Sequence, residues 1–488
     1  MWFKSLARAT RTLLQVVSIG LIGCLVAVVI MFVYVLDSRP DLSVWHLADL
    51  DEEYTAKSDV SDFSQYLALE DRLFEQLDAL VYAKVPQGPE DTINRYSSGS
   101  LSDPGRWPVN WNRSFELRQK QPRAGVLLLH GLSDSPYSMR ALAQLLHGQG
   151  AWVVGLRIPG HGTAPSGLVE TRWQDMAAAV RLAAKHVRDA AGDKPFYLVG
   201  YSNGGALSME YTLSTLDDTS LPRPSGVILL SPEIGVSAVA ALAVWQGRLG
   251  HLLGLEKLAW NGLLPEYDPY KYGSFAVNAG DLAHRITVHI QEQLDALQGS
   301  GKLEKMPPIL AFQSSVDATV TASALVSNLF ARLPPANHEL VLFDINRNVK
   351  AATLLKHDPR TVFKPLLDKS DRGYNLTVVA NEGPETNRVV ARTTAHGKED
   401  YSAPVKLGKW PPGIYSLAHV ALPFSPRDPV YGGPAAGKSP GIQLGNLALR
   451  GERGVLQVSG TDLMRLRWNP FFDYVGSRVL RFTQLSDQ

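Results

Sequence analysis

The chain of 488 residues has an ordinary globular composition, with 45% hydrophobic and 19% charged residues, and its formal net charge is +1. This length accommodates one large domain with insertions or roughly two to three smaller domains. No dense run of Lys and Arg occurs beyond the N-terminal tip, which argues against nucleic acid as a partner. The single cysteine, Cys24, excludes disulfide bonds within the chain and leaves the redox compartment open.

The N-terminal region contains an apolar stretch, residues 13–36, that carries no charged side chain. As a helix it is long enough to cross a hydrocarbon layer of about 30 Å, which predicts a transmembrane helix. Lys4, Arg8 and Arg11 precede this stretch, whereas mostly acidic residues follow it. The positive-inside bias therefore predicts that residues 1–12 are cytoplasmic and that the rest of the chain is extracytoplasmic, or periplasmic in a Gram-negative bacterium.

Two alternatives apply to this segment. A cleaved signal peptide is disfavoured because the apolar run is longer than usual and no small-residue cleavage site closes it. Lipidation at Cys24 is suggested by the preceding Leu-Ile-Gly, but cleavage there would leave further apolar residues at the start of the mature chain. We therefore expect Cys24 to be a small apolar residue within the membrane helix.

Residues 37–109 are predicted to lead from this helix into the main domain. Between Val60 and Val85 apolar residues recur at helical spacing among acidic ones, which predicts an amphipathic helix. This helix is expected to be a stalk or to dock on the main domain. Residues 86–123 are rich in Pro, Gly, Ser and Asn, which predicts an irregular segment.

Residues 110–488 are predicted to form one α/β domain, because short apolar runs alternate with helical patterns. Strands are expected at residues 125–131, 151–157, 195–202, 226–232 and 307–313, and helices at about residues 138–146, 173–190 and 205–216. Continuous apolar strands between helices are typical of a doubly wound, mostly parallel sheet with helices on both faces.

Two longer segments interrupt the pattern. Residues 234–305 are rich in Trp, Tyr and Leu and contain no clear strand, which predicts a mainly helical cap. A second insertion is expected at about residues 346–410, where residues 374–381 and 387–394 suggest a β-hairpin. The aromatic residues of the cap are expected to line an apolar pocket or to form ordinary core, and they are Trp245, Trp260, Tyr267, Tyr270 and Tyr272.

A G-x-S-x-G motif, Gly200 to Gly204, lies between a predicted strand and a predicted helix. This context is typical of a nucleophile elbow, a sharp turn that holds a serine in a strained backbone between small residues. The following helix directs its N-terminus at Ser202, where its dipole favours developing negative charge. Ser202 is therefore the predicted nucleophile, and the alternative is a chance glycine-rich turn.

Three motifs together resemble a known family. HGLSDSPYSMR begins at His130, RIPGHGTAP at Arg157 and GYSNGG at Gly200. They resemble the monoacylglycerol lipase and serine aminopeptidase-like branch of the α/β-hydrolase superfamily, in particular its membrane-anchored bacterial members. The resemblance covers about residues 110–330 and a short piece near His419.

The resemblance implies where an oxyanion hole lies. In α/β hydrolases, the loop after the first clear strand and the residue after the nucleophile each supply a backbone N–H group. These positions correspond to Leu132 and Asn203. His130, at the start of the same loop, is expected to orient it by hydrogen bonds rather than to act in catalysis.

The resemblance also implies a triad in the chain order Ser, Asp, His, so the acid lies downstream of Ser202. Asp317 follows the predicted strand 307–313, in a turn similar to the acid-bearing turn of the family. Asp344, at the end of LVLFD, is the alternative, although it falls one strand later. The non-catalytic alternative, in which the aspartate only caps the helix that follows, applies to both positions.

The base must follow the acid, and His419 is favoured because it lies in an apolar stretch before a turn-rich segment. We expect it at the end of a strand, beside a surface loop. About 100 residues separate it from Asp317, several times the usual interval in the family, because of the second insertion. The other candidates are flanked by charged or loop sequence, and they are His338, His357 and His396.

These residues predict a serine hydrolase that cleaves a carboxylic ester, lipid-like or small, through an acyl-enzyme. One alternative is an aminopeptidase or amidase with the same triad, and another is a non-catalytic envelope protein that retains the fold as an interaction platform. No metal or organic cofactor is expected, because the sequence lacks metal-ligand spacings and phosphate-binding glycine motifs. The sequence does not indicate an oligomeric state.

Overall fold

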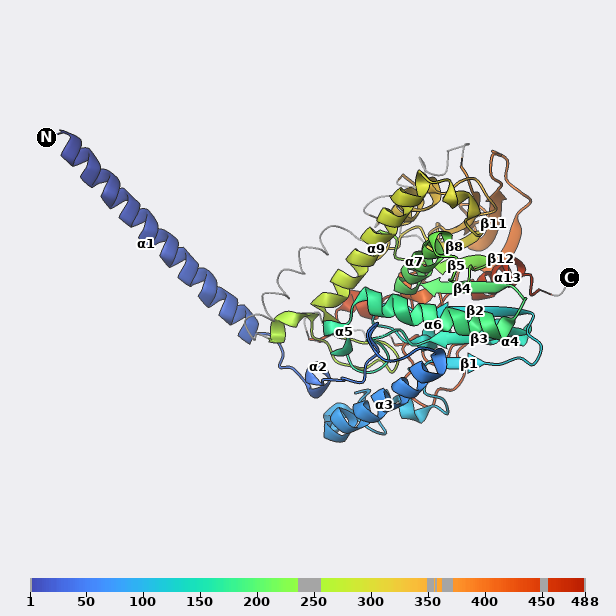
Figure 1. Cartoon of the computed structure of the whole chain (residues 1–488), viewed down its shortest axis with the longest axis horizontal. Helices are drawn as coiled ribbons and strands as arrows, with labels where there is room; N and C mark the ends of the chain where they lie inside the picture. The colour runs from blue at the N-terminus through green and yellow to red at the C-terminus, as the bar shows by residue number, and fades with distance from the viewer. Residues whose placement is uncertain are drawn as a thin grey trace.

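The computed structural model describes residues 2–235, 256–348, 355, 358–361, 372–447 and 455–486. Its main feature is a ten-stranded sheet in the order β1-β3-β2-β4-β5-β8-β9-β10-β11-β12 (Figure 1). The strands are β1 (Phe115–Leu117), β2 (Ala124–Leu129), β3 (Ala151–Leu156), β4 (Phe196–Tyr201), β5 (Gly226–Leu230), β8 (Ile309–Ser314), β9 (Glu339–Phe343), β10 (Asn375–Asn381), β11 (Arg388–Thr394) and β12 (Val405–Lys409).

The interior of the sheet is parallel from β3 to β10, and antiparallel pairs occur only toward its edges, at β1 and at β11 and β12. Every residue of β2, β4, β5 and β8 is buried, as expected for parallel strands covered on both faces. The predicted mostly parallel, doubly wound sheet is therefore confirmed, and the five predicted strands lie within two residues of the observed ones.

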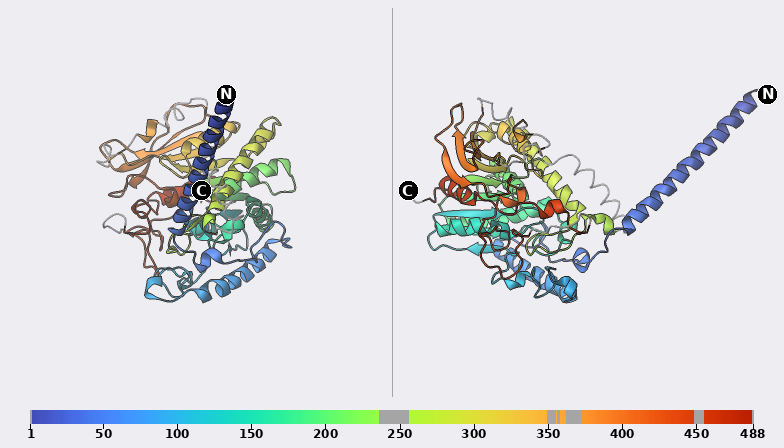
Figure 2. Two further views of the ribbon diagram at one scale, coloured as in Figure 1. Left: turned by 90° about the vertical axis from the view of Figure 1, so that its left-hand side faces the viewer. Right: turned by 180° about the vertical axis from the view of Figure 1, so that it is seen from behind.

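Successive side chains of the central strands enter two different cores. Leu127 and Leu129 pack with α6 (Trp173–Ala191), α7 (Asn203–Asp217) and α9 (Val277–Gln298). Val126 and Leu128 pack instead with α4 (Arg140–Gly148) and α13 (Phe472–Phe482). This alternation follows from the two-residue period of a strand, and it gives a three-layer arrangement of helices, sheet and helices (Figure 2).

The segment before the sheet packs against the main domain. The predicted amphipathic helix is α3 (Phe63–Leu80), and its Tyr66 and Leu73 are fully buried. The Tyr66 hydroxyl donates a hydrogen bond to the backbone oxygen of Arg157, at 2.6 Å. Of the two expected arrangements, the docked helix is therefore the observed one. The strand β1 lies in the segment that was predicted to be irregular, because its antiparallel partner β3 is distant in sequence.

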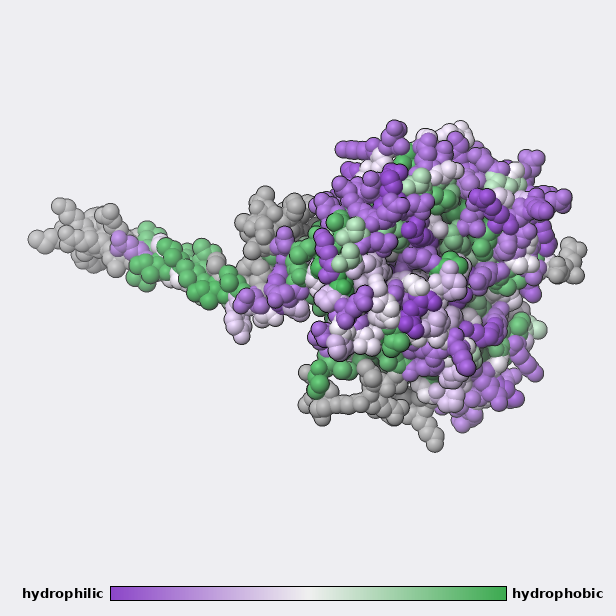
Figure 3. All heavy atoms as spheres, turned by 90° about the horizontal axis from the view of Figure 1, so that it is seen from below, coloured by the Kyte–Doolittle hydropathy of each residue, from purple (hydrophilic) through white to green (hydrophobic). Residues whose placement is uncertain are grey.

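The first helix, α1 (Trp2–Asp37), projects from the main domain (Figures 1 and 2). Its described side chains are largely apolar and exposed (Figure 3). A membrane span needs about 20 consecutive apolar residues in one helix. Among the residues that the structure describes, no helix combines this length and hydropathy. The helical conformation of residues 13–36 is confirmed, whereas their prediction as a transmembrane segment is not supported.

The segment expected to form a cap, residues 234–305, is described from residue 256 onward, apart from residues 234 and 235. It contains α9, which packs against α7, and a two-stranded sheet of β6 (Trp260–Gly262) and β7 (Phe275–Ala276). The two short strands were not predicted. Residues 236–255, including Trp245, lie outside the described residues.

The second insertion, expected at residues 346–410, extends the main sheet. Its predicted hairpin is confirmed as the antiparallel pair β10 and β11, and β10 also pairs in parallel with β9. The third strand, β12, is largely exposed and was not predicted. Residues 349–354, 356–357 and 362–371 of this insertion lie outside the described residues.

Candidate active site

Ser202 lies between the last residue of β4 and the first residue of α7, with φ 53° and ψ −117°. L-residues seldom adopt this backbone conformation, which persists only where the surroundings impose it. Here the Ser202 N–H group donates to the backbone oxygen of Leu230 at 3.0 Å. Its carbonyl oxygen accepts from Gly205 N–H at 2.9 Å and from Glu233 N–H at 3.0 Å. The turn is therefore the sharp strand-to-helix elbow that the motif predicts.

The two glycines of the motif allow close backbone approach. A Cβ atom on Gly204 would lie 2.2 Å from the backbone oxygen of Leu129 and 2.5 Å from that of His130. A Cβ atom on Gly200 would lie 2.3 Å from the backbone oxygen of Gly204. Real Cβ atoms do not come so close to backbone oxygens, so the turn requires glycine at both positions.

Ser202, His419 and Asp317 are joined by two short contacts although they come from distant parts of the chain. The Nε2 atom of His419 lies 3.1 Å from the Oγ atom of Ser202. Its Nδ1 atom lies 2.8 Å from the Oδ2 atom of Asp317. The exposed fractions of Ser202, Asp317 and His419 are 8%, 6% and 5%, so the three side chains are largely shielded from water.

The carboxylate of Asp317 is held ionised in this position. Burial raises its pKa, but the hydrogen bond and charge interaction with His419 and backbone donors outweigh this effect, and the net shift is downward. The backbone N–H groups of Thr319 and Val320 donate to Oδ1 at 2.9 and 3.0 Å, and the Gln313 side chain donates to Oδ2 at 3.1 Å. An ionised Asp317 accepts a hydrogen bond from the Nδ1–H group of His419, which leaves Nε2 without a proton and able to accept from the Ser202 hydroxyl.

The alternative acid, Asp344, has other partners. It accepts hydrogen bonds from the guanidinium groups of Arg347 and Arg360. The alternative bases also lie elsewhere: the Nδ1 atom of His338 accepts a hydrogen bond from the backbone of Ile309, at 3.2 Å. His396 is exposed and contacts the backbone of Arg372. His357 lies outside the described residues.

His419 begins a short 3-10 helix, η9 (His419–Ala421), rather than ending a strand. This differs from the expected location, because the preceding strand β12 ends at Lys409 and is followed by Pro411, Pro412 and Gly413. Proline removes backbone donors that a continued strand would need. The side chain of His419 packs beside the ring of Tyr201, with ring centroids 5.4 Å apart.

The loop that carries Leu132 lies directly against the nucleophile. A Cβ atom on Gly131 would be 3.2 Å from the Cβ atom of Ser202. Ser133, the residue after Leu132, has φ 56°, and its carbonyl oxygen accepts from the Tyr272 N–H group at 2.8 Å. Within the described part of the chain, the backbone N–H groups of Leu132 and Asn203 donate to no other group. Both remain available to a ligand beside Ser202.

One residue at this site was not identified from the sequence. Glu233 is buried, and its Oε2 atom accepts a hydrogen bond from the Asn203 side chain at 3.1 Å. Burial raises its pKa, an effect that is opposed by Asn203 and by the nearby His419. No motif marks Glu233. Its position just after β5 was an available signal, because side chains at the carboxyl ends of parallel strands converge on one site.

The aromatic residues of the expected cap that the structure describes mostly make internal contacts. Tyr270 is 1% exposed and stacks on Tyr137, with ring centroids 3.8 Å apart. The Tyr272 hydroxyl accepts a hydrogen bond from the backbone of Thr163 at 2.9 Å. Trp260 is buried in the main core. Tyr270 and Tyr272 therefore form core, whereas Trp260 also lines a cleft away from Ser202.

A cleft of about 1180 Å³ lies elsewhere on the domain. It is lined by residues between His46 and Thr55, between Ser166 and Asp175, and between Glu256 and Asp281. Ser202, Asp317 and His419 do not line this cleft. Across the described ranges, no three His, Cys, Asp or Glu side chains are placed to hold a metal ion.

Residues 120–345 match the model of a protein family described as serine aminopeptidase, S33. This range contains Ser202, Asp317, Leu132 and Asn203, but not His419. A curated relative, the thermostable monoacylglycerol lipase of Bacillus sp. (strain H-257), is 28% identical over 129 residues. That alignment covers 26% of this chain and 48% of the relative, so the chain spans about half the length of the curated relative it matches.

Two solved structures are similar to about half of this chain. One is a metagenome-derived lipolytic enzyme, with a TM-score of 0.37 and 20% identity over 48% of this chain and 87% of that chain. The other is the monoacylglycerol lipase of Paleococcus ferrophilus, with a TM-score of 0.36 and 19% identity over 47% of this chain and 88% of that chain. The parallel sheet, the strained elbow and the family match together show an α/β-hydrolase fold.

Proposed function

We propose that this protein is a serine hydrolase that cleaves carboxylic esters. In this proposal Ser202 is the nucleophile, His419 the general base and Asp317 the residue that orients the base. The observation that carries the proposal is the hydrogen-bonded series from Ser202 Oγ through His419 to Asp317, at 3.1 and 2.8 Å. Nucleophile, base and orienting acid in this geometry are the parts that nucleophilic catalysis by serine requires.

The proposed reaction begins when the Ser202 oxygen attacks the ester carbonyl carbon and His419 Nε2 accepts the hydroxyl proton. The resulting tetrahedral intermediate carries a negative oxygen, to which the N–H groups of Leu132 and Asn203 donate. The intermediate collapses when His419 gives the proton to the departing alcohol, which leaves an acyl-Ser202 ester. Water, deprotonated by His419, then hydrolyses this ester and regenerates the free serine.

The two backbone donors account for a large part of the expected rate. Removal of one oxyanion donor costs about 2.7 to 4 kcal/mol in known hydrolases. The first turn of α7 adds its dipole at the same place, because Asn203 is the first residue of that helix. The strained conformation of Ser202 serves this arrangement, since a sharp strand-to-helix turn presents the serine Oγ atom at the carboxyl end of the sheet.

An aminopeptidase or amidase activity is the second candidate, because the same three residues can cleave either bond. The description of the matching family favours this candidate, whereas the name of the curated relative favours ester cleavage. We place the ester first because an alcohol leaves more readily than an amine and makes a smaller demand on the site. A non-catalytic role is disfavoured, since no member of the series is missing.

The test is a direct comparison of the two bond types. Purified full-length protein is incubated with p-nitrophenyl butyrate and, separately, with amino acid p-nitroanilides. Ester turnover that is lost in Ser202→Ala and retained in Ser327→Ala, an exposed serine of α10 (Ala322–Asn328), supports the proposal. Turnover of the anilides alone favours the aminopeptidase, and no turnover of either class contradicts a hydrolase.

A further inference from the structure

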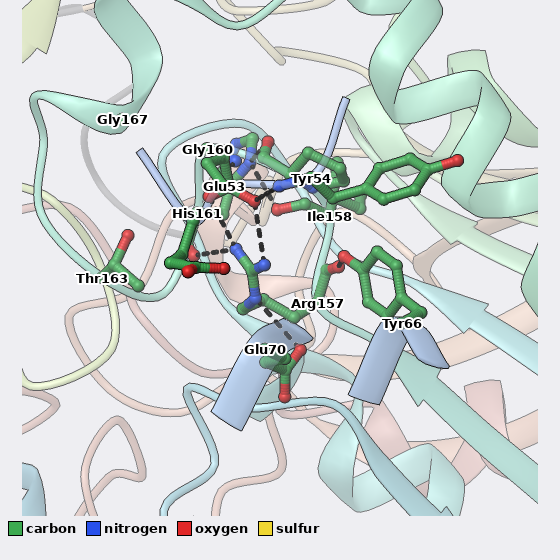
Figure 4. A network of polar contacts seen from close by, with 12 residues as sticks. Glu53, Tyr54, Tyr66, Glu70, Arg157, Ile158, Gly160, His161, Thr163 and Gly167 are labelled. Carbon is green, nitrogen blue, oxygen red and sulfur yellow. Dashed lines mark hydrogen bonds and ion pairs between the residues drawn. The ribbon is translucent and has the colours of Figure 1, made fainter. Parts of the chain in front are cut away.

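A buried arginine connects the N-terminal segment to the sheet. Arg157 follows β3 and is 1% exposed. Figure 4 shows its polar contacts with Glu53 and Glu70. Its Nη1 and Nη2 atoms donate to the two carboxylate oxygens of Glu53, at 3.0 and 2.9 Å. Its Nε atom donates to Glu70 at 3.0 Å, and Nη1 also donates to the backbone oxygen of His161 at 3.1 Å. Both carboxylates come from the segment that precedes the sheet.

The two carboxylates also hold the backbone around the arginine. Glu53 accepts from the Gly160 N–H group at 2.9 Å. Glu70 accepts from the N–H and hydroxyl groups of Ser114, both at 2.8 Å, and this hydroxyl in turn accepts from the Arg157 N–H group. A buried charge with this many partners is tolerated only while all of them are present. Loss of either carboxylate would leave the guanidinium partly uncompensated and would release the turn after β3.

This turn is bonded to His130. The N–H group of Ile158, the residue after Arg157, donates to Nε2 of His130 at 3.0 Å. Because Nε2 accepts, the ring proton is on Nδ1, which lies 2.8 Å from the carbonyl oxygen of Gly131 and donates to it. Burial and the neighbouring His161 and Arg157 lower the pKa of His130 far below its usual value, so the ring stays neutral and keeps this arrangement.

The Gly131 carbonyl determines the direction of the Leu132 N–H group. In a trans peptide the C=O and N–H groups of one plane point in opposite directions, so the bond from His130 fixes both. Gly131 packs against Ser202, and a side chain on it would press on Tyr201 and Ser202. The proposed oxyanion donor is therefore the last member of a hydrogen-bonded series that starts at Glu53 and Glu70.

We infer that Glu53 and Glu70 are positioning residues for the reaction, and that through Arg157 and His130 they fix the direction of the Leu132 N–H group. This inference rests on the proposed hydrolase function. It gives the N-terminal segment a part in catalysis, although none of its residues is among those that contact the reacting atoms. An error of about 1 Å in such a donor costs roughly 100-fold in rate, so even a partial release is measurable.

The experiment measures kcat and KM of full-length Glu53→Gln and Glu70→Gln for p-nitrophenyl butyrate. Each substitution keeps the size of the side chain and removes its charge. We expect kcat to fall at least tenfold while KM changes less than about twofold, because the lost contact is made to the transition state. The matched controls are Glu52→Gln and Asp71→Asn, neighbouring carboxylates that pair with Arg72 and Arg113 at the surface.

The outcomes separate the inference from the proposed function. If the parent protein turns over no ester, the proposed function fails. If the parent is active and both variants keep its kcat, or lose kcat and raise KM in proportion, the positioning role is overturned. Because Glu70→Gln removes a fully buried charge, thermal unfolding is measured as well. If Glu70→Gln does not fold, the test uses Glu53→Gln and Tyr66→Phe instead. Tyr66→Phe removes the hydroxyl that donates to the backbone oxygen of Arg157, and the same changes in kcat and KM are expected.

Discussion

The Nε2 atom of His419 lies 3.1 Å from the Oγ atom of Ser202, although 217 positions separate the two residues in the chain. Between Asp317 and His419 the chain adds four strands, β9 to β12, to the sheet before it returns to the elbow. The long interval between acid and base therefore does not displace the base, because the added strands extend the edge of the sheet and leave its carboxyl ends in place.

The first prediction concerns the base. Replacement of His419 by alanine removes the group that accepts the Ser202 proton, so kcat for ester hydrolysis should fall by about 10³-fold or more. The control is His396→Ala, an exposed histidine that should leave kcat unchanged. Steady-state kinetics of the two variants check this, and a His419→Ala enzyme within tenfold of the parent would show that another group serves as the base.

The second prediction separates the two candidate acids. Asp317→Asn keeps the size of the side chain but no longer favours the proton on Nδ1 of His419, so kcat should fall by about 10⁴-fold. Asp344→Asn should keep kcat, because Asp344 pairs with Arg347 and Arg360. It should instead lower the free energy of unfolding by about 1 to 2 kcal/mol. The reverse pattern in kinetics and chemical denaturation would assign the acid to Asp344.

The third prediction tests the steric requirement of the elbow. Gly204→Ala places a Cβ atom 2.2 Å from the backbone oxygen of Leu129, and backbone atoms of a central strand cannot move aside cheaply. The free energy of unfolding should fall by about 3 kcal/mol. Gly280→Ala is the matched control, because nothing lies within 4 Å of its new Cβ atom on α9 and alanine favours helix by about 1 kcal/mol. Equal stabilities of the two variants would contradict the packing around the elbow.

The fourth prediction concerns acid stability. Burial lowers the pKa of His338 from its ordinary value of 6.5 to about 4. Above pH 6.5 the ring is neutral in both states, and between pH 6.5 and 4 the unfolded chain binds a proton that the folded chain does not. Stability should therefore fall as the pH falls through this window, by about 3 kcal/mol from this residue.

Chemical denaturation of the parent and of His338→Asn at pH 7.5 and 4.5 isolates this contribution. Other buried histidines titrate in both proteins, so they cancel in the comparison. The asparagine variant should lose about 2 to 3 kcal/mol less than the parent between these two pH values. Equal losses in the two proteins would show that His338 titrates normally in the folded state.

Local sequence signals were sufficient for the central strands and for Ser202. The strands β2, β4 and β5 are buried on both faces and therefore appear as continuous apolar runs. The elbow requires a fixed set of small residues at fixed spacing, so a five-residue motif identifies it.

Features that depend on distant partners were not predictable in this way. The strand β1 has three residues, and its pairing with β3 is invisible in its own composition. The docking of α3 was left open because an amphipathic pattern shows that a face is covered but not by what. Glu233 was missed because its burial beside Asn203 depends on how the chain turns after β5. The transmembrane prediction rested on hydropathy alone, and the described helices do not support it.

The most direct test of the central claim is covalent labelling of the native full-length protein with a fluorophosphonate. This reagent loses fluoride to an activated serine and leaves a stable phosphonyl ester, whose position is read by mass spectrometry of the digested protein. We predict modification at Ser202 alone, with none in the Ser202→Ala variant and greatly slowed modification in His419→Ala. No label on the native protein, or label at a different serine, would contradict the assignment of Ser202 as the nucleophile.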